Sequence, residues 1–286
     1  MKEKPLVSIL MTTYNREQFV NEAISSVLAI DYINFELIIV DDGSKDKTVP
    51  IIQTFLPRDR RIRFFQNDQN LGDYPNRNKA ASYALGKYLV YVDSDDRMFA
   101  DALSKFVEAM ETHQCSFGIF SHSGNHEIFM LEPGAIIPAH FFNKPVLNFG
   151  PVATIVKKDY FDQVGGFPVK YGPANDMYYN LKVASETNTL VFPFPLVDYR
   201  LHEGQELNNK YSYLYNNYTY LRDALIELRL PLTESQRAFL SNKNKRRFLT
   251  NLIKYYFNNL NWDKTINAIR LANFGVRDMI IAVFQK

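Results

Sequence analysis

Short apolar runs that alternate with helical patterns constrain this chain more than any other feature of its sequence. The runs 6–11, 35–40 and 87–92 have the length and the β-branched or aromatic content of buried strands. Helical spacing occupies the stretches 15–30, 48–56 and 76–85. We expect Asn15 to cap the first of these helices. Strands and helices in alternation predict an α/β fold, a mostly parallel sheet with helices on both faces.

Each of these apolar runs ends in a polar or acidic cluster. Thr12–Asn15 follow the first run, Asp41–Ser44 follow the second, and Asp93–Asp96 follow the run 87–92. Ligands of open parallel sheets bind outside the carboxyl ends of the strands. We therefore expect the three clusters to lie around one crevice.

The strand signals stop near residue 205, which predicts two regions. Residues 1–204 form the α/β domain, and 205–286 form a small helical region. The helical region has 13 Lys and Arg against 6 Asp and Glu, whereas the α/β domain has 20 against 25. This asymmetry indicates an acidic site in the first region and a basic second region near an anionic partner.

The basic region allows two interpretations. Lys243, Lys245, Arg246 and Arg247 lead into the amphipathic stretch 248–256, a combination suited to peripheral contact with an anionic membrane. The alternative is a helix that packs on the α/β domain and leaves a solvated basic rim.

Composition excludes several other classes of protein. A content of 46% hydrophobic and 22% charged residues is that of a globular protein rather than a disordered one, and no apolar stretch approaches the ~20 residues of a spanning helix. The single cysteine, Cys115, excludes an intrachain disulfide and fits a reducing compartment. We therefore expect a cytoplasmic protein, at most peripheral at the inner face of a membrane.

The strongest local signal is Asp93-Ser94-Asp95-Asp96, a D-x-D pattern at the end of a strand. Carboxylates this close repel one another unless a cation lies nearby. Hard divalent cations bind few carboxylates and complete their shell with phosphate oxygens. A solvated acidic loop is the alternative, but the preceding strand and the second acidic pair at Asp41 and Asp42 favour a metal–diphosphate site.

Other polar residues suit a nucleotide. A carboxylate of the pair Asp41-Asp42 can accept a hydrogen bond from a base or a ribose, although the same tetrapeptide also suits a simple helix start. Tyr14 can stack on a base and Thr12 can contact it, while Arg77 suits a base or diphosphate, or a plain helix surface.

Several segments of the chain, in their sequence order, resemble the GT-A-fold glycosyltransferases of family 2. The resemblance rests on the following segments: 7–16, 40–44 with Thr48, 70–72 with Arg77 and Asn78, 91–96, 164–168, 175–176 and 199–202. It spans residues 5–203, so the helical region lies outside it. Asn175 departs from the pattern, because the family usually has Glu before this Asp.

The resemblance implies a role for each of nine residues. The nucleotide-sugar would contact Thr12, Tyr14, Asp42, Arg77 and Asp93. The metal would contact Asp95, Asp96 and His202, and Asp176 would be the catalytic base. The departure at Asn175 leaves the base in place and removes its usual acidic neighbour.

The implied activity is inverting transfer of a sugar from a nucleotide-diphosphate sugar, expected to be a UDP-sugar, to an acceptor hydroxyl. The acceptor would be a carbohydrate or a lipid-linked molecule in surface polysaccharide or glycoconjugate synthesis, and the cofactor Mn²⁺ or Mg²⁺. No nucleic-acid partner is expected. The alternative is a degenerate member that binds nucleotide-sugar or a partner without catalysis. A dinucleotide-dependent oxidoreductase is disfavoured, because the first strand lacks the G-x-G-x-x-G pattern.

Overall fold

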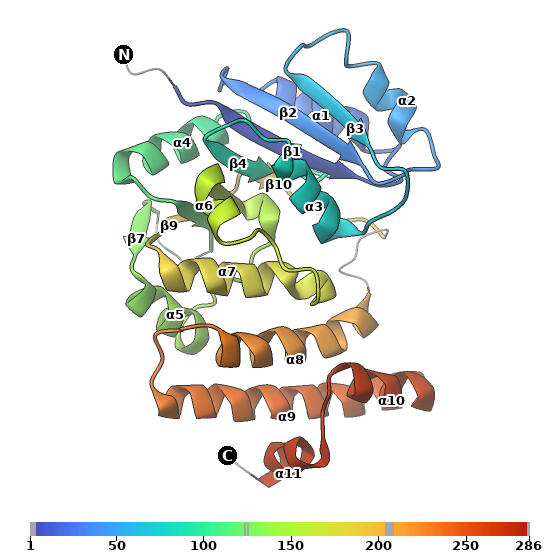
Figure 1. The fold of residues 1–286 in the computed structure, drawn as a ribbon, viewed down its shortest axis with the longest axis vertical. Helices are drawn as coiled ribbons and strands as arrows, with labels where there is room; N and C mark the ends of the chain where they lie inside the picture. The colour runs from blue at the N-terminus through green and yellow to red at the C-terminus, as the bar shows by residue number, and fades with distance from the viewer. Residues whose placement is uncertain (1–3, 123, 125, 204–208, 285–286) are drawn as a thin grey trace.

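The computed structural model describes residues 4–122, 124, 126–203 and 209–284, which form a layered α/β domain with helices stacked beneath it (Figure 1). The strands are β1 (Val7–Thr13), β2 (Phe35–Asp41), β3 (Ile62–Gln66), β4 (Tyr88–Tyr91), β5 (Arg97–Met98), β6 (Phe117–Phe120), β7 (Phe129–Leu131), β8 (Thr154–Lys157), β9 (Thr189–Phe192) and β10 (Val197–Asp198). The helices are α1 (Val20–Leu28), α2 (Thr48–Gln53), α3 (Asp73–Ser82), α4 (Ala102–His113), α5 (Pro133–Phe142), α6 (Lys158–Gln163), α7 (Asn175–Glu186), α8 (Lys210–Glu227), α9 (Glu234–Asn259), α10 (Trp262–Leu271) and α11 (Val276–Phe284), with the short turns η1 (Pro151–Ala153) and η2 (Gly172–Ala174).

The central sheet confirms the predicted fold class. Its strand order within the described residues is β3-β2-β1-β4-β8-β6-β9-β7. The strands β3, β2, β1 and β4 are parallel to one another, as are β6 and β9. The strand β8 runs antiparallel to both β4 and β6 and thereby joins these two parallel groups. Consequently β1, β2, β4, β6 and β9 all end at the same edge of the sheet.

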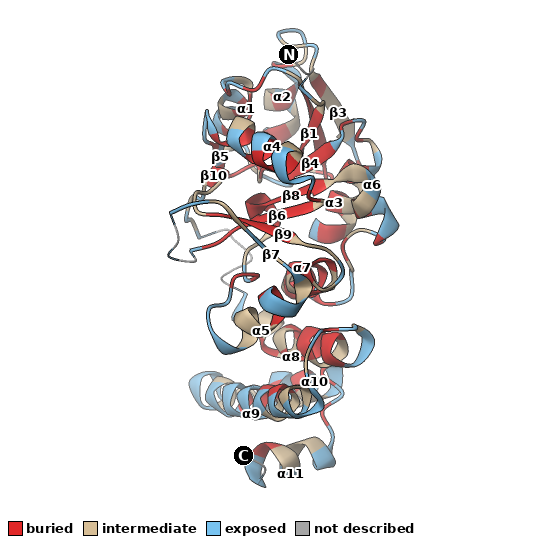
Figure 2. Cartoon of the chain, turned by 90° about the vertical axis from the view of Figure 1, so that its left-hand side faces the viewer, coloured by how far each residue is buried: buried red, intermediate tan, exposed pale blue. Residues whose placement is uncertain are grey.

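Alternate residues of the buried strands supply two cores, one on each face of the sheet. Ile9 and Met11 of β1 pack with α1 and α4, whereas Leu10 packs with α3 and α7. Successive side chains of a strand point to opposite faces, so a continuous apolar run needs helices on both sides. Figure 2 shows the strands buried between these helices.

The C-terminal helices extend the second core and then build a third. Leu221 and Ala224, in the second half of α8, belong to the core that contains α3 and α7. Leu214 and Tyr218, in the first half of α8, pack instead with Phe248 of α9 and with α10 and α11. The helix α8 therefore connects the α/β domain to the helices that follow it.

The structure buries part of the amphipathic stretch 248–256 between helices. Phe248 and Leu252 are buried, and the ring of Phe248 stacks on Tyr218 with centroids 4.8 Å apart. These side chains pack in the third core, so they do not face a membrane. Burying them stabilises the packing of α8 on α9 by about 1.5–3 kcal/mol per side chain.

The outer face of α9 carries a different set of residues. It is mostly exposed, as Figure 2 also shows for this helix. An exposed row three or four residues apart, here called the outer stripe, consists of Phe239, Lys243, Arg246, Thr250, Ile253, Phe257 and Leu260. The helix α9 contains six Lys or Arg residues and one acidic residue, Glu234. Val276, Ile280, Val283 and Phe284 are exposed on the neighbouring α11.

The first helix also differs from its prediction. The helix α1 begins at Val20, and its N-cap is Phe19 rather than Asn15. Asn15 has a positive φ of 51°, and its Oδ1 accepts a hydrogen bond from the Lys45 N–H at 2.8 Å. Asn15 therefore joins two loops and caps no helix. Among the described residues, no helix is long and apolar enough to cross a membrane.

Candidate active site

The three polar clusters meet at the carboxyl edge of the parallel strands, as the sequence predicted. The backbone N–H of Asn15, after β1, donates to Ser44 Oγ, after β2, at 2.8 Å. Arg16 reaches the third cluster, where its Nε lies 3.0 Å from Asp95 Oδ2. Residues far apart in sequence therefore form one site because their strands are parallel and adjacent.

Asp93, Asp95 and Asp96 form a compact acidic cluster. One carboxylate oxygen of each lies within 4.8 Å of the others, and Asp96 is fully buried. Burial raises the pKa of Asp93, and burial together with the neighbouring Asp93 raises the pKa of Asp96 to about 8. The cause is that charged carboxylates lose hydration and repel one another. A bound cation would remove both penalties.

The donor set of this cluster suits a divalent cation. Asp96 Oδ2 is buried and has no hydrogen-bond partner among the residues that the structure describes. An unpaired buried carboxylate oxygen is costly, and carboxylate oxygens are the preferred protein ligands of Mg²⁺ and similar hard cations. The three aspartates therefore fit the metal that the sequence predicted.

The short pairing of β10 with β5 carries the last motif to the acidic cluster. Beyond β10, the backbone N–H of Arg200 donates to Asp96 Oδ1 at 3.0 Å. His202 Nε2 lies 2.8 Å from Asp95 Oδ2, and its ring stacks on Phe19 with centroids 4.5 Å apart. His202 therefore lies directly beside Asp95.

Arg77 projects from α3 into the same site and is only 6% exposed. Its guanidinium pairs with Asp73 and with Asp93, each at 2.7 Å. Its Nη1 is buried without a hydrogen-bond partner in the described part of the chain. A buried guanidinium nitrogen with an unused N–H suits an anionic oxygen of a ligand.

Asp42 has a clear structural role at this edge. Its carboxylate accepts hydrogen bonds from Asn67 Nδ2 at 2.8 Å and from the backbone N–H groups of Leu71 and Gly72, both at 2.9 Å. Asp41 accepts from the N–H groups of the turn that follows it. The adjacent carboxylates therefore hold two different loops, a division of roles that the sequence left undecided.

Thr12 lies near the end of β1, and Tyr14 follows that strand directly. Thr12 pairs with Val40 of β2 in the sheet register, and Tyr14 is 42% exposed. An exposed aromatic ring at the carboxyl edge of a parallel sheet is available for stacking on a flat ligand.

Asp176 lies in the first turn of α7 and is 8% exposed. Burial raises its pKa to about 7, although the Met177 N–H, which donates to Oδ1 at 2.7 Å, and the charge of Arg77 oppose this shift. The N-cap of α7 is Ala174, so Asp176 does not cap the helix through its side chain. A carboxyl with a pKa near neutrality is suited to general-base chemistry.

Asn175 has a separate, structural function. Its Oδ1 accepts from the Tyr171 N–H at 2.9 Å and its Nδ2 donates to Gly172 O at 2.7 Å. These bonds form the turn before α7 and so position Asp176.

Sequence reasoning did not single out Arg16, Arg200 or Tyr74. Arg200 could have been found from its place in the same tetrapeptide as His202. Tyr74 is buried against Asp176 and lowers the pKa of that carboxyl through a hydrogen bond. Nothing in the sequence pairs Arg16 with Asp95.

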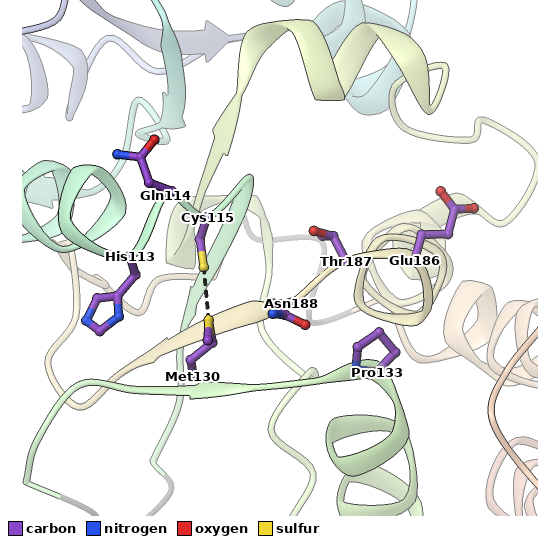
Figure 3. Close-up of a pocket in the computed structure, with 8 residues that line it drawn as sticks. All are labelled: His113, Gln114, Cys115, Met130, Pro133, Glu186, Thr187 and Asn188. Carbon is purple, nitrogen blue, oxygen red and sulfur yellow. Dashed lines mark hydrogen bonds between the residues drawn. The ribbon is translucent and has the colours of Figure 1, made fainter.

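A separate hollow lies at the opposite edge of the sheet (Figure 3). Cys115 and Asn188, which line it, precede β6 and β9, whereas the acidic cluster follows β4. Cys115 Sγ contacts Met130 Sδ at 3.4 Å there. This hollow is therefore not part of the candidate active site.

Comparisons with known proteins agree with one another. The model of the family described as glycosyl transferase family 2 matches residues 8–165. An uncharacterized glycosyltransferase of Haemophilus influenzae is 41% identical over 106 residues, which are 37% of this chain and 42% of that protein. The chain thus spans less than half the length of this relative. The UDP-Glc:alpha-D-GlcNAc-diphosphoundecaprenol beta-1,3-glucosyltransferase WfgD of Escherichia coli is 30% identical over 224 residues, 76% of this chain and 86% of that protein.

Solved structures share the fold. TarS of S. aureus, in complex with UDP, superposes with a TM-score of 0.71 at 19% identity and covers 97% of this chain and 81% of its own. A mannosyltransferase of Pyrobaculum calidifontis, in complex with GDP-Man and Mn²⁺, has a TM-score of 0.65 at 13% identity, over 99% of this chain and 85% of its own.

Proposed function

Because the chain belongs to glycosyltransferase family 2, we propose that it transfers a sugar from a nucleotide-diphosphate sugar to an acceptor hydroxyl, with inversion at the anomeric carbon. One observation carries the proposal. Asp176, a buried carboxyl with a pKa of about 7, interacts with the charge of Arg77, and Arg77 also pairs with Asp93 of the acidic cluster at 2.7 Å. A proton acceptor and a cation-binding cluster are thus adjacent.

The proposed roles follow from these positions. Asp176 takes the proton of the acceptor hydroxyl as the new bond forms, because an alcohol is a poor nucleophile while it keeps its proton. Arg77 contributes its buried guanidinium to the diphosphate of the donor. Inversion follows by analogy with inverting glycosidases, since direct displacement needs one base and no carboxylate nucleophile.

The cation would be held by Asp95 and Asp96, with His202 and Asp93 beside them. When bound, Mn²⁺ or Mg²⁺ neutralises the charge that develops on the departing diphosphate. We propose a UDP-sugar as the donor, with Tyr14 stacked on the uracil and Thr12 and Asp42 beside it. The name of the E. coli relative, which specifies UDP-Glc, supports this choice of base.

We propose a carbohydrate or lipid-linked acceptor and a cytoplasmic location at the inner face of a membrane. The diphosphoundecaprenol acceptor in the E. coli relative's name supports a lipid-linked substrate. The outer stripe of α9 supports peripheral contact, because exposed Phe257 and Leu260 can enter the interface while Lys243 attracts anionic headgroups. This surface includes Lys243, Arg246 and Ile253 from the segment that the sequence indicated, but not the buried Phe248 and Leu252.

Calorimetry and product analysis test the proposal. We expect UDP to bind much more tightly with Mn²⁺ than with EDTA, because without a cation the acidic cluster faces the diphosphate directly. GDP provides the control for the base. Equal affinity for UDP in both conditions would remove the metal from the mechanism. Metal-dependent donor binding with no hydrolysis or transfer of any UDP-sugar would favour the degenerate, non-catalytic alternative.

A further inference from the structure

Arg16 joins the loop after β1 to the acidic cluster. Its Nη1 donates to the carbonyl oxygens of Tyr14 at 3.3 Å and Asn15 at 3.2 Å, and its backbone N–H donates to Thr48 Oγ1 at 2.7 Å. Its Nε donates to Asp95 Oδ2 at 3.0 Å. One side chain therefore connects the backbone that carries Tyr14 with a carboxylate of the cation site.

The same oxygen of Asp95 has a second partner. His202 Nε2 lies 2.8 Å from Asp95 Oδ2, so an arginine and an imidazole share one carboxylate oxygen. A guanidinium stays charged throughout the physiological pH range. A divalent cation that approaches this oxygen is therefore repelled by Arg16 and competes with it for the same lone pairs.

We propose that Arg16 is a positioning residue that occupies Asp95 before ligands bind and couples the cation to the nucleotide. This inference rests on the proposed function, because it concerns the same cation site. Binding of the cation at Asp95 releases the guanidinium, whose planar fork matches diphosphate oxygens. The nucleotide in turn draws Arg16 away from Asp95 and makes that oxygen available. Each ligand thus strengthens the binding of the other, as linkage requires.

The coupling follows from charge. Without a nucleotide, Arg16 already supplies Asp95 with a positively charged partner, so a cation must displace it to reach that oxygen. With a diphosphate present, the guanidinium has a second anion to pair with. The cost of displacing it from Asp95 then falls. Arg16 therefore disfavours cation binding before the nucleotide arrives and loses this effect afterwards.

The test measures Mn²⁺ binding directly, from the paramagnetic resonance signal of free Mn²⁺ with and without UDP. We expect Arg16→Gln to bind Mn²⁺ roughly tenfold more tightly without UDP and to lose about the same factor of UDP-dependent enhancement. Arg16→Lys keeps the charge but not the fork, so its enhancement by UDP should lie between those of wild type and Arg16→Gln. Arg61→Gln is the matched control, because Arg61 also pairs with an aspartate through Nε at 3.0 Å but lies outside the site.

Three results would overturn the inference. An unchanged or weakened Mn²⁺ affinity in Arg16→Gln excludes competition at Asp95 while leaving the cation site intact. If Arg16→Gln does not fold, an unchanged enhancement by UDP in Arg16→Lys excludes the coupling. Absence of Mn²⁺ binding to the wild type even with UDP overturns both this inference and the proposed cation site, so the two failures are distinguishable.

Discussion

Replacing Asp176 with asparagine separates catalysis from folding at the candidate base. In the wild type, Asp176 Oδ1 accepts a hydrogen bond from the Met177 N–H at 2.7 Å. Asparagine has the same size and keeps Oδ1, so it can still accept this bond. It can no longer take a proton. Transfer should therefore fall by roughly 10²–10⁴, the usual scale for the loss of a general base, which corresponds to about 3–5 kcal/mol in the barrier.

Asp176→Asn should lower the transfer rate but should leave the stability of the folded protein unchanged or raise it. Burial raises the pKa of Asp176 from 3.8 to about 7 in the folded protein. The folded state therefore holds a proton that the unfolded chain has lost, and stability falls as the pH rises from about 4 to about 7. Above that range the ionised side chain costs at most about 4 kcal/mol, a cost that asparagine avoids. At pH 8 the variant should melt at the same temperature as wild type or at a higher one.

A matched control and three measurements make the outcome decisive. Asp159 occupies the same position in the first turn of α6, where its Oδ1 accepts the Tyr160 N–H at 2.7 Å, but it is exposed. Asp159→Asn should leave the melting temperature, the affinity for UDP with Mn²⁺ and the transfer rate unchanged. Asp176→Asn should change only the rate by orders of magnitude. A folded Asp176→Asn protein with near-normal transfer would refute the assignment of the base.

Three further outcomes follow from the same geometry. The transfer rate of the wild type should rise with pH up to about 7 and then level, because burial keeps Asp176 protonated at lower pH; a flat kcat/KM profile would contradict this. Asp95→Asn should weaken metal-dependent UDP binding in calorimetry, and an unchanged affinity would place the cation elsewhere. Leu260→Ser should reduce sedimentation with anionic vesicles more than Leu85→Ser does, since both leucines are about equally exposed, at 75% and 74%, but only Leu260 lies in the outer stripe. Equal binding of both variants would end the membrane proposal.

The sequence determined the framework of the site. Continuous apolar runs followed by polar clusters predicted a parallel sheet. Because ligands of such sheets bind at the carboxyl ends of the strands, the clusters were expected at one edge. The bonds from Asn15 to Ser44 and from Arg16 to Asp95 agree with that placement. Local patterns were enough to predict this placement, because the carboxyl ends of parallel strands lie at the same edge of the sheet.

The tertiary structure decided the contacts between residues distant in sequence. Arg16 and Asp95 are 79 positions apart, and no local pattern pairs them. Phe248 and Leu252 belong to an amphipathic pattern that fits a membrane or a core equally well, and only the packing of α8 against α9 made them core residues. Asparagine is common at helix N-caps, yet the side chain of Asn15 accepts a hydrogen bond from the backbone N–H of Lys45 in another loop. The pKa of Asp176 likewise depends on burial, which results from the packing of many segments and not from the residues beside it.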